Sequence, residues 1–155
     1  MKKLFVAAFA ALFAMGLNAQ DRKQGQDINQ SEAPEAVMET FNEAFASAKG
    51  VEWEKDGDTY KADFELNGED KEVKITESGE LEMVKTEIRQ RDLPQAVQET
   101  LSKDYADYDL DDFSKVEKGG MTKYKVKAEK GNMKEILMFD SSGKKIEKDK
   151  MDKDK

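Results

Sequence analysis

An α+β fold is predicted by three observations: a helical apolar stripe that begins at a proline, alternating strands joined by Gly turns, and a second copy of both. The second copy follows the first by about 60 residues, so one duplication accounts for both halves of the pattern. The sequence therefore predicts two tandem repeats, each one helix plus an antiparallel four-strand meander. Each unit is too small to bury much surface alone, so we expect the two to share a core.

Residues 34–48 are predicted to form the first helix. Pro34 suits the first helical turn, where its missing N–H is not needed. The apolar residues recur at three- and four-residue spacing and form one stripe: Val37, Phe41, Ala44, Phe45 and Ala48. Gly50 stands where a helix commonly ends.

Four strands are predicted after this helix, at residues 51–56, 60–66, 71–76 and 80–88. Their apolar and charged residues alternate, which is typical of a strand with one buried face. Turn signals separate them: Asp56-Gly57-Asp58, Asn67-Gly68 and Ser78-Gly79. The only Trp, Trp53, is predicted on the buried side of the first hairpin.

The second copy begins at Asp92, and its apolar residues match those of the first. Val97, Leu101 and Tyr105 follow Val37, Phe41 and Phe45 by 60 residues, and Tyr124, Val126 and Ala128 follow Tyr60, Ala62 and Phe64 by 64. Ile136 and Met138 follow Val73 and Ile75 by 63 and are predicted to point inward. The predicted core comprises Phe41, Phe45, Trp53, Phe64, Leu101, Phe113, Tyr124 and Val126.

Residues 1–19 have the pattern of a secretory signal peptide. Lys2 and Lys3 precede an apolar run over residues 4–15, with small residues before a cut at Ala19/Gln20. The run is short for a bilayer span, so we expect an exported protein, periplasmic or secreted, with no membrane span after signal removal. Residues 20–32 are predicted to be a disordered mature N-terminus and residues 148–155 a charged tail. The domain then spans 33–147, with repeats at 33–90 and 91–147.

Composition excludes several chemistries. The net charge is −8, which argues against general binding of nucleic acid. The chain has no His and no Cys, which removes His-based catalysis, thiolate nucleophiles and the usual zinc ligands. Ser141 and Lys144 have the spacing of a Ser-x-x-Lys motif, but they fall in a predicted hairpin turn without the companion motifs. We therefore predict no enzyme and no cofactor.

The acidic link at residues 104–112 is the candidate for Ca²⁺. Asp107, Asp109 and Asp111 match the first three ligand positions of a helix-loop-helix calcium loop, but Asp112 and Lys118 stand where Gly and Glu are required. A non-standard loop that binds Ca²⁺ or a small ligand and a solvated helix-to-strand link remain alternatives.

Several motifs together resemble the PepSY-like family of small exported bacterial proteins, also described as β-lactamase-inhibitor-like. They are the Pro-initiated helix, Val-Glu-Trp-Glu from Val51, Tyr-x-Ala-x-Phe from Tyr60, Asp-Leu-Pro-x-Ala-Val from Asp92 and Phe-Asp-Ser-Ser-Gly from Phe139. The resemblance covers about residues 33–147. It implies that the sheets of both units continue into one surface with the helices behind it, and that the protein binds or inhibits another exported protein. The Cys residues of the secreted inhibitor that names the fold are absent here.

A partner surface is predicted on the outer face of the second unit. Lys123, Lys125 and Lys127 alternate with the inward residues of their strand. Inward Ile136 and Met138 would leave Leu137 and Phe139 pointing outward beside these lysines, across a three-residue loop. The pattern predicts a basic patch with two apolar anchors that binds an acidic partner. The alternative is that the tail or a bulge covers Leu137 and Phe139.

Overall fold

The computed structural model describes residues 25–146, so the predicted signal peptide and the charged tail lie outside the described residues. The elements are β1 (Gln26–Ile28), the 3-10 turn η1 (Gln30–Glu32), α1 (Glu35–Ala44), β2 (Lys49–Asp56), β3 (Thr59–Leu66), β4 (Glu69–Thr76), β5 (Leu81–Glu87), η2 (Gln90–Asp92), α2 (Gln95–Asp104), β6 (Asp109–Lys118), β7 (Met121–Lys130) and β8 (Met133–Phe139). Within the described part, neither helix is long and apolar enough to cross a membrane.

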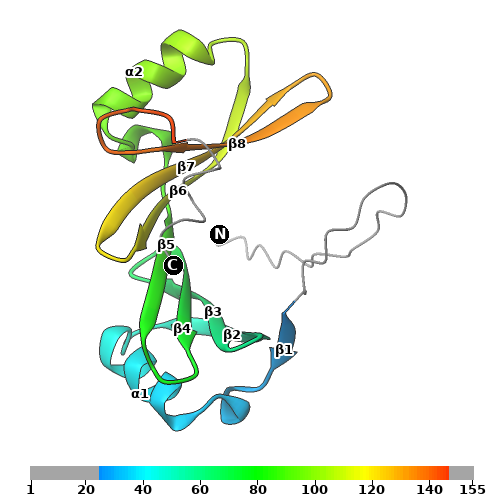
Figure 1. The fold of residues 1–155 in the computed structure, drawn as a ribbon, viewed down its shortest axis with the longest axis vertical. Helices are drawn as coiled ribbons and strands as arrows, with labels where there is room; N and C mark the ends of the chain where they lie inside the picture. Colours follow the sequence, from blue (N-terminus) through cyan, green and yellow to red (C-terminus); the bar gives the residue numbers. More distant parts are fainter. Residues whose placement is uncertain (1–24, 147–155) are drawn as a thin grey trace, which may run out of the picture.

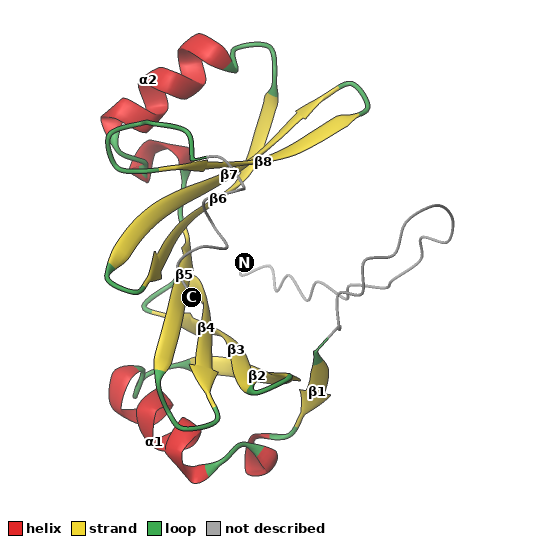
Figure 2. Ribbon diagram, in the orientation of Figure 1, coloured by secondary structure: helices red, strands yellow, loops and turns green. Residues whose placement is uncertain are grey.

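The eight strands form one sheet in which spatial order equals chain order, and every neighbouring pair is antiparallel. The predicted α+β class is confirmed. Figure 1 shows α1 and α2 at the two ends of the molecule, with the sheet running from β1 to β8 between them. Figure 2 separates the helices from the strands by colour. We call residues 25–88 the first half and residues 89–146 the second half.

Both helices pack on the same face of the sheet. One row of directly paired residues crosses six strands, and residues paired in this way share a face: Phe64, Lys71, Thr86, Lys115, Tyr124 and Phe139. Phe64 at one end lies in the cluster of α1, and Phe139 at the other end lies in the cluster of α2. The opposite face of the sheet therefore has no helix of the described chain over it.

Each helix begins directly after a proline and presents one apolar stripe to the sheet. Pro34 precedes α1 and Pro94 precedes α2, both in an extended conformation that starts a helix. Val37 and Phe41 are the buried residues of α1, and Val97 and Leu101 are their counterparts in α2. Their four-residue spacing places them one turn apart on the same side of each helix.

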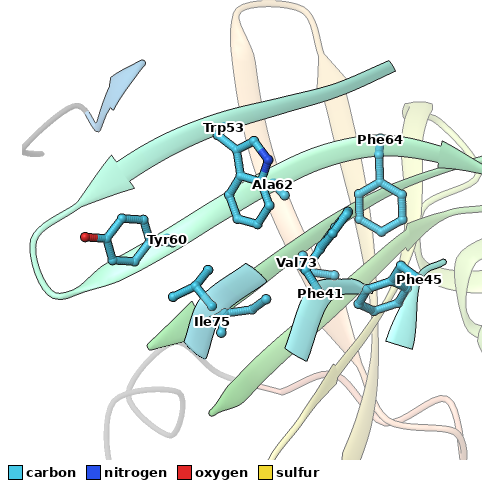
Figure 3. Close-up of a cluster of buried hydrophobic side chains, with 9 residues drawn as sticks. Phe41, Phe45, Trp53, Tyr60, Ala62, Phe64, Val73 and Ile75 are labelled. Carbon is cyan, nitrogen blue, oxygen red and sulfur yellow. The ribbon is translucent and has the colours of Figure 1, made fainter. Parts of the chain in front are cut away.

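The core of the first half is aromatic. Phe41 lies between Trp53 and Phe64, with ring centroids 5.0 Å apart in both edge-on pairs. Phe45 completes the group against Phe41 and Phe64. Figure 3 shows these rings in one cluster with Val73 and Ile75 of β4. Edge-to-face rings of this kind add to the stabilisation that burial alone supplies.

The second half has its own core, separate from that of the first, so the expectation that the two units share one core is wrong. Its buried residues are mainly aliphatic. Its buried members are Leu93, Val97, Leu101, Val126, Ala128, Leu137 and Phe139. Of the eight predicted core residues, six are buried, and Phe113 and Tyr124 are half-buried against this second cluster. The core prediction is therefore confirmed for the first half and partly for the second.

The predicted orientation of β8 is wrong by one residue. The hairpin closes on a two-residue loop, with Lys130 paired to Met133, so Val126 pairs with Leu137 and Tyr124 with Phe139. Leu137 and Phe139 are therefore buried in the core, and the prediction that they point outward is overturned. A shift of one residue exchanges the two faces of a strand, which is why Ile136 lies outside instead.

Two further predictions need correction. Residues 26–32, expected to be disordered, form β1 and η1, with the Asn29 N–H donating to the Glu32 carboxylate at 2.7 Å. The second half has three strands after its helix rather than four, followed by a single bridge between Phe139 and Lys145. β1 pairs Ile28 with Trp53, and the chain after β5 repeats this contact when the Ile88 N–H donates to the Phe113 carbonyl.

A glycine turn is tied to each helix in the same way. Gly79 follows β4 and its carbonyl accepts a hydrogen bond from the Thr40 hydroxyl of α1 at 2.6 Å. Gly143 follows β8 and accepts one from Thr100 of α2 at 2.9 Å. Both glycines have positive φ, and a Cβ on either would collide with a helix carbonyl. Glycine is therefore required by conformation and by space.

Candidate functional site: the open face of the sheet

The face of the sheet opposite the helices, the open face, carries alternate residues of every strand. Over β2 to β4 its charged residues are mostly acidic: Glu52, Glu54, Asp56, Asp63, Glu65, Asp70 and Glu72, with Lys49, Lys61 and Lys74. Over β6 and β7 its basic residues are Lys118, Lys123, Lys125 and Lys127, and its acidic residues are Asp109, Asp111 and Glu129 near one end of the two strands. The sign of the charge therefore changes along the sheet.

A hollow of about 560 Å³ lies on the acidic part of this face. Its carboxylates come from four neighbouring strands: Glu52, Asp63, Glu65, Asp70, Glu72 and Glu87. Lys49, Lys71 and Lys85 line it as well, and Lys85 bonds to Glu72 at 3.4 Å. We call it the acidic hollow.

Local ion pairs neutralise part of the acidic half. Lys61 contacts Glu54 at 2.5 Å and Asp63 at 3.2 Å. Partial burial acts to lower the pKa of Lys61, but the bonds to these carboxylates outweigh it and the pKa is raised. Lys61 therefore stays protonated and links the carboxylates of β2 and β3.

The structure places Lys123, Lys125 and Lys127 on the open face, as their register with β6 requires. Lys127 lies within 3.6 Å of three carboxylates, those of Asp111, Asp112 and Glu129. Hydrogen bonds to Glu129 and Asp111 raise the pKa of Lys127. Lys123 and Lys125 make no ion pair within residues 25–146, so these two lysines carry the uncompensated charge of the strand.

The apolar neighbours of the lysines differ from those predicted. Lys125 pairs with Met138 and Lys127 pairs with Ile136. Ile136 is 42% exposed, whereas Met138 is 7% exposed, so Ile136 is the accessible apolar residue. The exposure of Ile136 could have been predicted from the first half. There the two-residue Asn67-Gly68 loop pairs Leu66 with Glu69. The same loop length in the second half gives the observed register.

A smaller hollow of about 330 Å³ lies where the start of β5 meets the β6–β7 turn. Leu81 and Met121 line it, and they are 37% and 41% exposed. Lys118 and Lys123 lie on its rim with Glu80 and Glu82. We call it the junction hollow, and no sequence pattern predicted it because its residues come from separate strands.

The acidic link of residues 104–112 does not assemble into a cation site. Asp107 bonds to Lys130 at 3.4 Å, and Asp111 and Asp112 bond to Lys127. Across residues 25–146, no three carboxylates converge in a way that could hold a metal ion. The geometry therefore favours the solvated link over the calcium loop.

The Ser141–Lys144 stretch is a turn, as predicted. The Asp140 carboxylate accepts hydrogen bonds from the Ser142 hydroxyl at 2.5 Å and from the Lys144 N–H at 3.1 Å. These bonds, chiefly the one from Ser142, lower the pKa of Asp140. The residues of the Ser-x-x-Lys spacing thus close a hairpin around Asp140.

Comparison with known proteins matches this chain to one family twice. The model described as "Putative beta-lactamase-inhibitor-like, PepSY-like" matches residues 20–82 and 58–147, and a comparison with curated proteins gives no match. Two overlapping matches to one model also indicate an internal repeat.

Three solved structures share the fold, and each aligns over 74% of this chain. A "putative periplasmic" protein from Bacteroides eggerthii is 25% identical with a TM-score of 0.70 over 86% of its length. A BLIP-like protein from Bacteroides fragilis is 27% identical, with a TM-score of 0.67 over 84% of its length. A DUF2874 family protein from Bacteroides ovatus is 27% identical, with a TM-score of 0.68 over 84% of its length. The chain belongs to the PepSY-like, β-lactamase-inhibitor-like family.

Proposed function

We propose that this protein is an exported, non-catalytic binding module that recognises another exported protein through the open face of its sheet. The observation that carries the proposal is the one-sided packing: both helices cover one face, and the other presents charged and apolar side chains. The family description, with its reference to an inhibitor, and the periplasmic description of one relative support a protein partner in an exported compartment.

The partner-binding residues we propose are Lys123, Lys125 and Lys127 together with Ile136. Leu137 and Phe139 leave the set because they are buried. An exposed apolar residue beside cations is a common anchor in protein interfaces. Residues 1–19 serve in this proposal as the signal that directs export.

We further infer that the chain arose by tandem duplication of one helix plus an antiparallel meander. Matching glycine turns on the two helices and the two overlapping family matches support this origin. The duplication would have supplied two copies of one helix-and-strand arrangement, and the open faces of the two copies differ in charge.

Affinity capture tests the proposed function. The mature chain, residues 20–155, is used as bait in a cell-envelope extract of the source bacterium, with mass spectrometry as readout. Two matched variants accompany it: Lys123→Glu with Lys125→Glu on the open face, and Lys103→Glu with Lys144→Glu on exposed positions elsewhere. We expect a protein that the wild type and the second variant retain and the first loses. Equal retention by all three baits would place the binding surface elsewhere.

A further inference from the structure

The charge of the open face reverses between β4 and β7, within single rows of paired residues. One row has Glu52, Asp63 and Glu72 on β2 to β4 and then Lys85, Val116 and Lys123 on β5 to β7. The next row passes from Glu87 through Ser114 to Lys125. Acidic and basic halves are thus consecutive parts of one surface.

The reversal remains after local ion pairs are taken into account. Four lining carboxylates of the acidic hollow make no ion pair within residues 25–146: Glu52, Glu65, Asp70 and Glu87. All four are exposed. Across the sheet, Lys118, Lys123 and Lys125 make none within the same residues. Among residues 25–146, the charge without an ion pair is therefore mainly acidic around the hollow, with Lys49 as the exception, and mainly basic over β6 and β7, with Asp109 as the exception.

The carboxylates of β2 and β3 are too far from the lysines of β7 for the two groups to neutralise each other in solution. β3 and β7 are four strand spacings apart, about 19 Å at the usual separation of neighbouring strands. The Debye length at physiological ionic strength is about 8 Å, so solvent ions screen one area from the other. A partner must therefore satisfy each area separately.

An apolar contact point lies beside the basic residues, at the start of β5 and the β6–β7 turn. Leu81 and Met121 in the junction hollow are two of the four large apolar residues that are exposed in residues 25–146. Exposed apolar residues beside charged ones are suited to bury against a partner's side chain while the charges orient it.

From these observations we infer that the partner's contact surface is itself divided, with basic side chains over the acidic hollow, carboxylates over Lys123 and Lys125, and an apolar side chain in the junction hollow. The inference rests on the proposed function and specifies the chemistry of the partner. A uniformly acidic partner would be repelled by the first half, and a uniformly basic one by the second. A different protein with both signs of charge meets both halves.

Two fluorescent peptides, hexalysine and hexaglutamate, test the division without a known partner. Each is titrated at low salt against the wild type and four charge-swapped variants, with fluorescence anisotropy as readout. The open-face variants are Glu52→Lys with Glu65→Lys, and Lys123→Glu with Lys125→Glu. Their matched controls are Glu39→Lys with Glu43→Lys on α1, and Lys103→Glu with Lys144→Glu, all at exposed positions. Circular dichroism checks that every variant is folded.

We expect the Glu52/Glu65 variant to lose hexalysine binding by at least about tenfold and to keep hexaglutamate binding. The Lys123/Lys125 variant should do the reverse, and each matched control should change binding much less. Equal losses in the controls would show that only net charge matters, which would overturn the inference. Failure of the capture experiment alone would instead count against the proposed function, since the peptide result does not depend on it.

A second copy of the chain is the other occupant that could satisfy both signs of charge. Sedimentation of the wild type at low and physiological salt distinguishes the two. A monomer at both salt concentrations agrees with a different protein as partner. A dimer at physiological salt that both open-face variants abolish would reassign the surface to self-association and overturn the inference.

Discussion

The two halves of the molecule share one arrangement of helix and strands but differ in their side chains. In the core, Phe41 and Phe64 of the first half correspond to Leu101 and Ala128 of the second, which are smaller. Val73 and Ile75 correspond to Leu137 and Phe139, which are larger. Losses of volume under the helix are thus offset by gains on the strand, which keeps both cores filled.

On the open face the same comparison shows no such compensation. At the corresponding positions of the second half, Lys127 replaces Asp63 and Ile136 replaces Glu72, counted from the shared hairpin register. Core positions are constrained by volume, whereas exposed positions can change sign without loss of fold. The comparison indicates that the core positions of both halves serve stability, whereas the open-face positions can vary to suit a binding partner.

The largest expected effect on stability comes from removing the aromatic side chain at matching positions of the two cores. Trp53→Ala should cost about 3–5 kcal/mol of unfolding free energy, because the side chain is buried in the first core and packs edge-on against Phe41. Phe113→Ala, at the matching position, should cost less because Phe113 is half-buried. Urea unfolding at pH 7 measures both. A larger loss for Phe113 would show that the second half depends on its strand β6 more than the burial indicates.

The next effect tests the register of β8. Leu137→Ala should cost about 2–5 kcal/mol, as expected for a buried leucine. Ile136→Ala should cost less than about 1 kcal/mol because the side chain is exposed. Chemical denaturation of the two variants gives the comparison directly. The reverse order would restore the three-residue loop and the outward direction of Leu137.

A smaller effect concerns the glycine turns. Gly131→Ala lies in open space at positive φ and should cost about 1–2 kcal/mol from backbone conformation alone. Gly143→Ala should cost more, because its Cβ would also meet the Ala96 carbonyl of α2. Thermal unfolding compares the two variants. Equal costs would mean that α2 moves away from the turn without loss.

The smallest expected effect is a pH-dependent stability contribution from the turn at Asp140, which the matching turn at Thr76 lacks. Asp140 accepts the turn hydrogen bonds in the second half, whereas the Thr76 hydroxyl accepts the Glu80 N–H in the first. Because the pKa of Asp140 is lowered in the folded state, its contribution is complete above the unfolded pKa of about 4 and is lost as pH falls through the folded pKa. The stability difference between wild type and Asp140→Thr should therefore shrink below pH 4. Urea midpoints from pH 7 to acid pH measure it, and a constant difference would exclude the carboxylate as its source.

Sequence periodicity was sufficient for most of the fold. Helix stripes, alternating strands and Gly turns predicted both helices and the hairpins, because these patterns follow from local geometry. β1 escaped prediction because three residues with only Ile28 apolar show no period. The β8 register failed because Leu137, Met138 and Phe139 are consecutive apolar residues, and all three are buried.

The candidate site was predicted only in part. The lysine alternation on β7 was sufficient to place Lys123 and Lys125 on one face, since the strand period is two. The acidic hollow and the junction hollow depend on which strands become neighbours. That information lies in the order of the sheet rather than in any single stretch of sequence.

The order of the sheet also bears on how fast the chain can fold. Every strand pairs with the strand before or after it, so most contacts join residues that are close in sequence, and folding rates rise as such separations fall. Among the strands of residues 25–146, only two pairings, β1 with β2 and β5 with β6, close a loop that contains a helix. Hairpins can therefore form one after another as the chain lengthens, and the two helix-spanning closures are the expected slow steps.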